Sequence, residues 1–233
     1  MTPVRVAVIL AGGLGTRLRA VVADRPKVLA EVDGRPFITY LLDQVASAGC
    51  REVVLCTGYL GEQIEAAIGP TYRGLEVTYS REAQPLGTGG ALRLAVERLD
   101  APEMLVLNGD SFCAASLAPF AEWHTARGSQ ASLLLAWVPD ASRYGTVVLD
   151  ASCRIQRFEE KRAANGPGWI NAGVYLLKRD LLASLPADAV VSLEREVFPR
   201  WCLYGFRVEA PFIDIGVPAE YARALAFFQQ LAA

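Results

Sequence analysis

A glycine-rich stretch with two cations beside it is the part of the sequence that first suggests chemistry. Residues 10–19 contain three glycines directly after an apolar run. Glycine has no Cβ, so backbone amides in such a stretch can approach phosphate oxygens closely. Arg17 lies within the stretch, and Lys27 follows Pro26, whose fixed φ angle helps to aim it. A lone glycine turn would leave both cations as ordinary solvated charges, but the combination favours a polyphosphate site.

Two familiar phosphate motifs fit this stretch poorly. The dinucleotide fingerprint GxGxxG is met at Gly13 and Gly15, but its third position is Leu18, and no acidic residue follows the second apolar run at 53–57. The P-loop form is excluded because the chain contains no Gly-Lys pair. The assignment as a nicotinamide-dependent oxidoreductase therefore rests on an imperfect fingerprint alone.

The single histidine offers no nucleophilic pair. His124 follows Trp123 inside a predicted helix, away from every glycine-rich loop. We expect a surface histidine without a catalytic role.

The elements that must position the glycine loop are alternating strands and helices. We predict strands at 4–10, 53–57, 75–79, 104–107 and 131–138, and helices at 36–49, 61–68, 87–99 and 117–126. The first strand is apolar on both faces, as in a central strand covered by helices on each side. This alternation predicts an α/β fold: a three-layer sandwich with a mostly parallel, mixed central sheet, and ligands bind at the carboxyl ends of strands in such folds.

The pattern changes from about residue 144. Strand-like pieces at 146–149, 154–158 and 170–177 come with fewer helical patterns, which predicts a small β region decorating the main sheet. Residues 218–231 then form an amphipathic helix. We find no repeat and no linker rich in Gly, Pro or Ser, so residues 1–233 are predicted to form one domain.

Composition narrows the function further. The chain has 23 basic and 25 acidic residues, so no bulk positive field attracts nucleic acid. The apolar runs are too short for a membrane span, which needs roughly 20 residues. Five cysteines without a CxxC pair predict free thiols in a reducing cytoplasm rather than a disulfide framework or zinc site. The N-terminal run reads as a first strand and not as a signal peptide.

The sequence resembles a known family, the sugar-phosphate nucleotidyltransferases (NDP-sugar pyrophosphorylases). Residues 10–43 match its opening motif, G-x-G-T-R-[LM] followed by P-K. Further matches follow in the family's order at residues 84–92, 108–110, 144–146, 158–161, 171–175 and 212–216. Each block alone is weak, but six in order make chance agreement very improbable. The resemblance implies the Rossmann-like nucleotidyltransferase fold and the reaction of an NTP with a sugar 1-phosphate to give an NDP-sugar and pyrophosphate.

The resemblance also implies roles for residues at the first loop and at two aspartates. Gly12, Gly13 and Gly15, with Leu10 and Thr16, would hold the base and phosphates. Arg17 would stabilise the leaving pyrophosphate, and Lys27 would contact the α-phosphate or the sugar phosphate. Asp110 and Asp214 would together bridge one Mg²⁺ to the α-phosphate, through the oxygen ligands that this ion prefers. Asp214 stands between two isoleucines, and burial of a carboxylate without a partner is costly.

A second set of residues would form the sugar pocket. Its implied members are Asn108, Gly145, Glu160, Lys161, Asn171 and Gly173. Glu160 would accept sugar hydroxyls and Lys161 would face the sugar phosphate, although the charge-rich run 157–162 also fits a solvated turn. Residues 1–140 would then be mainly the nucleotide part, residues 141–217 mainly the sugar-phosphate part, and residues 218–233 a C-terminal helix.

The second glycine-rich loop would read the base through Glu82, Gln84, Gly87 and Thr88. It resembles the E-P-L-G-T-x-G form of guanylyltransferases that act on mannose 1-phosphate or heptose 1-phosphate. GTP is therefore favoured, although Gln84 stands where a glutamate is common, and an amide both donates and accepts. Among acceptors we favour D-glycero-α-D-manno-heptose 1-phosphate, which leads to GDP-heptose for bacterial surface polysaccharide such as capsule or lipopolysaccharide.

Other assignments stay open at this point. They are guanylyl transfer to mannose 1-phosphate, uridylyl transfer to N-acetylmuramate 1-phosphate, and a non-catalytic paralogue that binds nucleotide sugars for regulation. The presence of Arg17, Lys27 and both aspartates favours the enzyme. Trp201, Tyr204 and Phe206 either form a homodimer patch or belong to the core.

Overall fold

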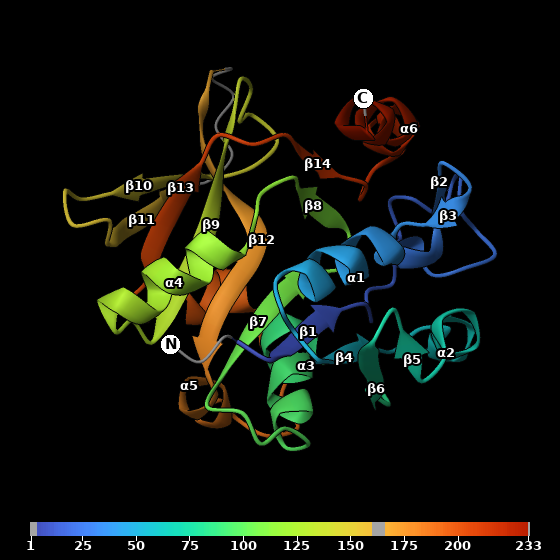
Figure 1. The fold of residues 1–233 in the computed structure, drawn as a ribbon, viewed down its shortest axis with the longest axis horizontal. Coiled ribbons are helices and arrows are strands. Elements are labelled where there is room, and N and C mark those ends of the chain that lie inside the picture. Colours follow the sequence, from blue (N-terminus) through green and yellow to red (C-terminus); the bar gives the residue numbers. More distant parts are fainter. Residues whose placement is uncertain (1–3, 160–165, 233) are drawn as a thin grey trace.

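The central feature of the fold is one ten-stranded sheet (Figure 1). The structure is a computed structural model that describes residues 4–159 and 166–232. The sheet runs in the order β11-β10-β12-β7-β1-β4-β6-β5, with β9 paired to β12 and β13 paired to β9. Its strands are β1 (Val6–Leu10), β4 (Glu52–Thr57), β5 (Thr71–Tyr72), β6 (Leu75–Arg81), β7 (Glu103–Asn108), β9 (Ala131–Val138), β10 (Thr146–Leu149), β11 (Ile155–Glu159), β12 (Gly168–Lys178) and β13 (Tyr204–Val208).

Helices cover both faces of this sheet. They are α1 (Ile38–Ser47), α2 (Gly61–Ile68), α3 (Gly87–Val96), α4 (Ala118–Arg127), α5 (Arg179–Ala183) and α6 (Pro218–Ala232), with short helical turns η1 (Lys27–Leu29) and η2 (Leu193–Val197). Buried side chains of α1, α2, α4 and α6 form one core, and those of α3, α5 and η2 form the other. Strand β1 contributes Ala7 and Ile9 to the first core and Val6 and Val8 to the second. The predicted three-layer α/β fold is confirmed.

The sheet is parallel at its centre and antiparallel beyond it. Strands β7, β1, β4 and β6 pair in parallel, whereas β12 runs antiparallel to both β7 and β9. The sequence analysis assigned residues 170–177 to a decorating β region, but β12 lies next to β7 inside the main sheet. Only the β10–β11 hairpin decorates the sheet edge as expected. The apolar run of β12 explains its central place, because residues 172 and 174–177 are buried.

A small two-stranded sheet joins distant parts of the chain at the end of β7. Strand β8 (Ser111–Cys113) pairs with β14 (Phe212–Asp214), and Asp214 stands opposite Ser111. The Ile215 N–H also donates to the Asp110 carbonyl at 2.8 Å. These bonds bring the two predicted metal carboxylates to neighbouring backbone positions. A second small sheet, β2 (Glu31–Val32) with β3 (Arg35–Pro36), precedes α1, so the helix begins at Ile38 rather than at Pro36.

The expectation of a surface histidine is wrong. His124 is 1% exposed, because α4 turns this side of the helix onto the sheet. Its Nδ1 lies 2.8 Å from the Ser132 hydroxyl, and its Nε2 lies 3.5 Å from a Glu103 carboxylate oxygen. The hydrogen bond with His124 lowers the pKa of Glu103. His124 therefore links α4 to β9 and β7. It lies outside both glycine-rich loops.

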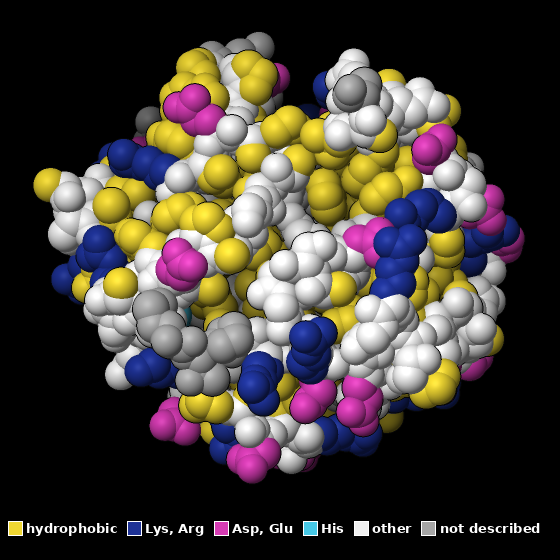
Figure 2. All heavy atoms as spheres, in the orientation of Figure 1, with side chains coloured by type: hydrophobic (Ala, Val, Ile, Leu, Met, Phe, Trp, Pro, Cys, Tyr) yellow, Lys and Arg dark blue, Asp and Glu magenta, His cyan; other side chains and the backbone are white. Residues whose placement is uncertain are grey.

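The cysteines, the surface charges, the helices and Phe206 bear on the remaining predictions made from the sequence. All five cysteines are free; Cys50, Cys56 and Cys113 are buried, and Cys202 is exposed. Basic and acidic side chains are interspersed over the face shown in Figure 2. In the described ranges, every helix is too short or too polar to cross a bilayer. Phe206 packs on Phe120 and Trp123, so it belongs to the core.

Candidate active site

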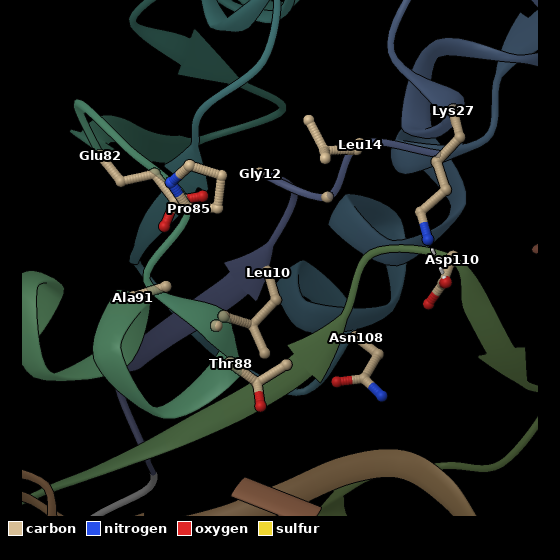
Figure 3. A pocket seen from close by; sticks show the side chains of 12 residues that line it. Leu10, Gly12, Leu14, Lys27, Glu82, Pro85, Thr88, Ala91, Asn108 and Asp110 are labelled. Carbon is tan, nitrogen blue, oxygen red and sulfur yellow. Dashed lines mark hydrogen bonds and ion pairs between the residues drawn. The ribbon is translucent and has the colours of Figure 1, made fainter. Parts of the chain in front are cut away.

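A cavity of about 270 Å³ opens where β1 and β7 end (Figure 3). Glu82 and Pro85 lie at one end of it, and Lys27 and Asp110 lie at the other. Nine predicted site residues line it: Leu10, Gly12, Gly13, Lys27, Glu82, Gly87, Thr88, Asn108 and Asp110. Leu14, Pro85 and Ala91 line it as well and were not singled out from the sequence. The cavity has the position at which α/β sheets bind ligands.

The first glycine loop wraps around the Lys27 side chain. A Cβ added at Gly13 would lie 3.7 Å from the Lys27 Cε, and one added at Gly15 would lie 3.4 Å from its Cβ. Gly15 has φ +59°, and its carbonyl accepts the N–H groups of Leu18 and Arg19, so the chain reverses there. Glycine is favoured where φ is positive. The loop thus keeps one side open to the cavity and the other side on Lys27.

Gly12 makes room for the Glu82 carboxylate. A Cβ at Gly12 would lie 2.6 Å from Glu82 Oε1, and one at Gly58 would lie 2.7 Å from the same atom. The other oxygen, Oε2, accepts the Leu86 N–H at 3.0 Å. Burial raises the pKa of Glu82. A half-buried carboxylate thus stands at the base of the second loop, facing the first.

Two carboxylates and two cations converge at the far end of the cavity. Lys27 Nζ forms an ion pair with Asp110 Oδ2. A Cβ added at Gly216 would lie 2.8 Å from Asp214 Oδ1, 3.6 Å from Asp110 Oδ2 and 3.5 Å from Arg17 Nη2. The side chains of Asp110, Asp214 and Arg17 therefore surround one point, although they come from three separate segments. Arg17 is exposed in the turn after the first loop.

Burial and neighbouring charges act in opposite senses on the Asp214 carboxylate of this cluster. Burial, followed by the charge of Asp110, raises the pKa of Asp214. The Gly216 N–H, which donates to Asp214 Oδ1 at 2.7 Å, and the charges of Lys27 and Arg17 act in the opposite sense. Within residues 4–159 and 166–232, no three His, Cys, Asp or Glu side chains gather into a metal site. The chain would thus supply two hard oxygen donors to a divalent cation, and substrate and water the rest, which suits Mg²⁺.

A group of asparagines lies beside Asp110. Asn108 and Asn171 both donate through their side-chain amides to the Tyr175 hydroxyl, at 3.3 and 3.1 Å. The Asn171 side-chain oxygen accepts the Gly173 N–H at 2.9 Å. Gly173 has φ +73°, and a Cβ there would lie 2.4 Å from the Ser111 hydroxyl.

One acceptor of this asparagine group is left over. The Asn108 Oδ1 is buried and has no hydrogen-bond partner among the described residues. This oxygen is available to a substrate hydroxyl or an ordered water, because a buried acceptor without a partner is unfavourable. Tyr175, which the sequence analysis missed, fixes both amides.

The other predicted residues lie outside the cavity lining. Gly145 lets the chain pass the Glu159 carbonyl, since a Cβ there would lie 2.6 Å from that oxygen. Gln84 and Thr16 are exposed. Glu160 and Lys161, the predicted sugar contacts, lie outside the described residues. The expectations for these positions stay predictions.

The second glycine loop is held by a segment that the sequence analysis did not single out, residues 189–194. Val191 accepts the Gly89 N–H and donates to the Leu86 carbonyl, both at 2.8 Å. The Thr88 hydroxyl accepts the Leu193 N–H and donates to Glu194 Oε2, again at 2.8 Å each. These contacts span more than 100 positions of the chain, so no local sequence signal marks them.

The fold and this site define the chain as a nucleotidyl transferase: the family model described as Nucleotidyl transferase matches residues 6–198, and the chain belongs to this family. It is 36% identical to the D-glycero-alpha-D-manno-heptose 1-phosphate guanylyltransferase of Aneurinibacillus thermoaerophilus, over 94% of this chain and 96% of that protein. It is 35% identical to the mannose-1-phosphate guanylyltransferase of Mycobacterium tuberculosis, over 94% of this chain and 63% of the longer relative.

A solved structure shows the same similarity in three dimensions. The crystal structure of HddC from Yersinia pseudotuberculosis complexed with GMP-PN superimposes with a TM-score of 0.86 and 32% sequence identity. The superposition covers 96% of this chain and 99% of HddC. The family resemblance inferred from the sequence is thereby confirmed.

Proposed function

We propose that this protein transfers a nucleotidyl group from GTP to a sugar 1-phosphate, giving a GDP-sugar and pyrophosphate. The observation that carries the proposal is the convergence of Asp110, Asp214, Arg17 and Lys27 at one end of a glycine-lined cavity. Such a site suits a reaction whose nucleophile needs no activation, because a sugar phosphate is already an anion. The enzyme must bring two anions together, align them and stabilise the charge that develops.

The residues present divide this work between them. A phosphate oxygen of the sugar 1-phosphate attacks the α-phosphorus of GTP, and the bond from that phosphorus to the bridging oxygen of the β-phosphate breaks. Arg17 and Lys27 offset the charge of the approaching phosphates and of the departing pyrophosphate. Asp110 and Asp214 would hold Mg²⁺, which when bound supplies Lewis-acid stabilisation at the α-phosphate. The Lys27–Asp110 ion pair keeps the lysine aimed at this end of the cavity before substrate arrives.

We assign recognition of the guanine base to Glu82. A carboxylate accepts two hydrogen bonds, as the N1–H and N2–H₂ edge of guanine requires. Glu82 lines the cavity, whereas Gln84, which departs from the common glutamate, is exposed and outside it. The unusual amide at position 84 therefore does not oppose guanine. The similarity to guanylyltransferases supports the same choice.

The favoured acceptor is D-glycero-α-D-manno-heptose 1-phosphate, with mannose 1-phosphate as the alternative. Both sugars have the manno arrangement at the ring, and relatives named for each are similarly close to this chain. The Asn108–Asn171–Tyr175 group offers one free buried acceptor to a sugar hydroxyl. Placement in the cytoplasm, where such phosphates are made, and a homodimer both remain predictions.

A pyrophosphate-release screen tests the proposal directly. Purified protein is offered each of the four NTPs with heptose, mannose and N-acetylmuramate 1-phosphates, with and without Mg²⁺. We expect turnover with GTP, dependence on Mg²⁺, and a preference for the heptose phosphate. Preference for UTP would overturn the base assignment. Binding of nucleotide sugars with no turnover under any condition would instead support the regulatory paralogue.

Variants test the carboxylate pair. We expect Asp110→Asn and Asp214→Asn each to lower kcat by roughly 10²–10³-fold, because a metal supplies several kcal/mol of charge stabilisation. The matched control is Asp188→Asn, at an exposed aspartate outside the cavity. Unchanged turnover in both cavity variants would defeat the assignment.

A further inference from the structure

A second cavity lies at the opposite end of the sheet from the candidate active site. It has a volume of about 440 Å³ and lies between the end of α4, α5 and the segment before β13. We call it the arginine pocket, because Arg127 and Arg200 line it. It shares no lining residue with the active-site cavity.

Strand register gives the separation of the two cavities. Asn108, at the end of β7, lines the active-site cavity. Glu103, at the start of β7, pairs in register with Lys178, whose N–H donates to the Gln130 carbonyl. Gln130 lines the arginine pocket. The length of β7 therefore stands between the two.

The charge of the arginine pocket is one-sided. Arg127 and Arg200 are its charged lining residues, and the lining contains no Asp or Glu. Neither arginine forms an ion pair with any residue in the described ranges. Arg127 donates instead to the Ser152 carbonyl at 2.8 Å. Two positive charges thus face one cavity without a compensating carboxylate.

Arg127 is held in a fixed orientation. Its guanidinium lies over the Trp123 ring, 4.7 Å from the centroid, and over the Tyr204 ring, 4.9 Å from the centroid. Stacking on two aromatic faces leaves the edge of the guanidinium plane, where its N–H groups point, for a partner. A guanidinium that is already ordered loses less conformational freedom on binding an anion.

The nearby helix end does not cancel this charge. The last carbonyls of α4 would repel an anion, but those of His124 and Thr125 accept N–H groups from Ser129 and Gly128. The Ser129 side chain also lines the pocket; the residue is 4% exposed, and its hydroxyl has no hydrogen-bond partner among the described residues.

We propose that the arginine pocket is a second binding site, for a small phosphate-bearing molecule. Two guanidinium groups match the charge and the acceptor oxygens of a phosphate. Trp201 and Tyr204 in the lining would offer aromatic surface to an organic part of the ligand. The proposal is independent of the nucleotidyl transfer proposed above.

Cys202 gives this pocket its own chemical reporter. It lines the pocket and is exposed, whereas Cys50 and Cys113 are buried and burial raises the pKa of each of these thiols to about 12. Cys56 is buried as well. Replacing the half-buried Cys153 with serine leaves Cys202 as the one accessible thiol. Its rate of modification then reports on the pocket alone.

The experiment measures Cys202 modification in the Cys153→Ser protein. The dianionic dithiobis(nitrobenzoate) and the neutral dithiodipyridine are compared, so that the reactivity of the thiolate cancels in the ratio of rates. Inorganic phosphate and mannose 1-phosphate are then added separately as protecting ligands. We expect the ligand to slow Cys202 modification several-fold. Stronger protection by inorganic phosphate would indicate a site for free phosphate, and stronger protection by mannose 1-phosphate would indicate a site for an organic phosphate.

Arg200→Gln is the test variant, and Arg51→Gln is the matched control. Arg51 is exposed and directly precedes β4. In the sheet, β12, β7 and β1 lie between β4 and β9. In Arg200→Gln we expect the anionic-to-neutral rate ratio to fall several-fold and the protection to disappear. Arg51→Gln should change neither. Absence of protection in the parent protein, or equal protection in Arg200→Gln, would overturn the proposal. Turnover of Arg200→Gln should stay within about twofold of the parent, because the active-site cavity is untouched.

Discussion

The two glycine-rich loops look alike in the sequence but do different work in the fold. In the first loop, a Cβ at Gly12 or Gly13 would meet the side chains of Glu82 or Lys27, which are site residues. In the second loop, a Cβ at Gly87 or Gly90 would lie 2.5 Å from a backbone oxygen of Val191 or Ala189. The missing Cβ atoms of the first loop give Glu82 and Lys27 room beside its backbone. The second is glycine-rich so that residues 189–194 can pack on it.

This difference changes how the second loop is understood. The sequence analysis gave Gly87 and Thr88 direct roles in nucleotide binding, and both line the cavity. However, the Thr88 hydroxyl already serves Leu193 and Glu194. We therefore propose that Thr88 positions the loop and that Glu82 is the group that would meet the base. A glycine motif identifies close approach, but the partner in that approach is a matter of tertiary structure.

The largest expected effect on stability is at Gly87. This residue has φ +72°, and an added Cβ would lie 2.5 Å from the Val191 carbonyl oxygen. We expect Gly87→Ala to lower the free energy of unfolding by about 2–4 kcal/mol, from backbone strain plus overpacking. Gly74→Ala is the control, since Gly74 has φ +84° but open space around it, and should cost about 1–2 kcal/mol. Urea denaturation measures both; equal losses would remove the packing role of the second loop.

Gly13→Ala should show the opposite behaviour. The new Cβ meets only Lys27 at 3.7 Å and φ is not positive, so stability should change by less than about 0.5 kcal/mol. The methyl group would nevertheless take up space beside the Lys27 ammonium, where a phosphate would bind. We expect kcat/KM for GTP to fall by up to about 100-fold, as for a displacement of roughly 1 Å. A variant that unfolds readily but turns over normally would reverse the proposed contrast between the loops.

Thr88→Val tests the positioning role in the second loop. Loss of the hydroxyl leaves the Leu193 N–H without a partner and leaves Glu194 Oε2 with the Ser192 hydroxyl as its donor, which costs about 1–3 kcal/mol. We expect a raised KM for GTP with a smaller change in kcat, and near-normal values for Thr88→Ser. Glu194→Gln should reproduce part of the effect, and the double variant should be non-additive. An effect of Thr88→Val that is fully additive with Glu194→Gln would favour a direct nucleotide contact.

The smallest expected effect is a pH dependence through Glu82. Burial raises the pKa of this carboxyl above its usual range, so it takes up a proton at a higher pH than an exposed glutamate. The protonated form has lost one acceptor for guanine, so kcat/KM for GTP should fall as the pH is lowered through this raised pKa. Glu82→Gln should have a lower and flatter profile. Identical profiles for the two proteins would separate Glu82 from base recognition.

Much of the fold was predictable because it follows local patterns. The apolar run of β1 and the helical spacing of α1 identify central and covering elements without any knowledge of their partners. The place of β12 was not predictable, because a buried run reads the same at a sheet edge as at its centre. His124 was misjudged for a related reason: the polar partners that make its burial tolerable, Glu103 and Ser132, come from two different strands.

The candidate site divides in the same way. Residue types and motif order, from the glycines and cations of the first loop to Asp110 and Asp214, are local properties of the chain, and they sufficed to indicate the family and its chemistry. Side-chain convergence is not local. The meeting of both carboxylates and Arg17 around Gly216, the packing of residues 189–194 on the second loop and the arginine pocket each join segments that lie far apart in the chain. Such contacts depend on which strands pair and in which register, and only the folded sheet decides that.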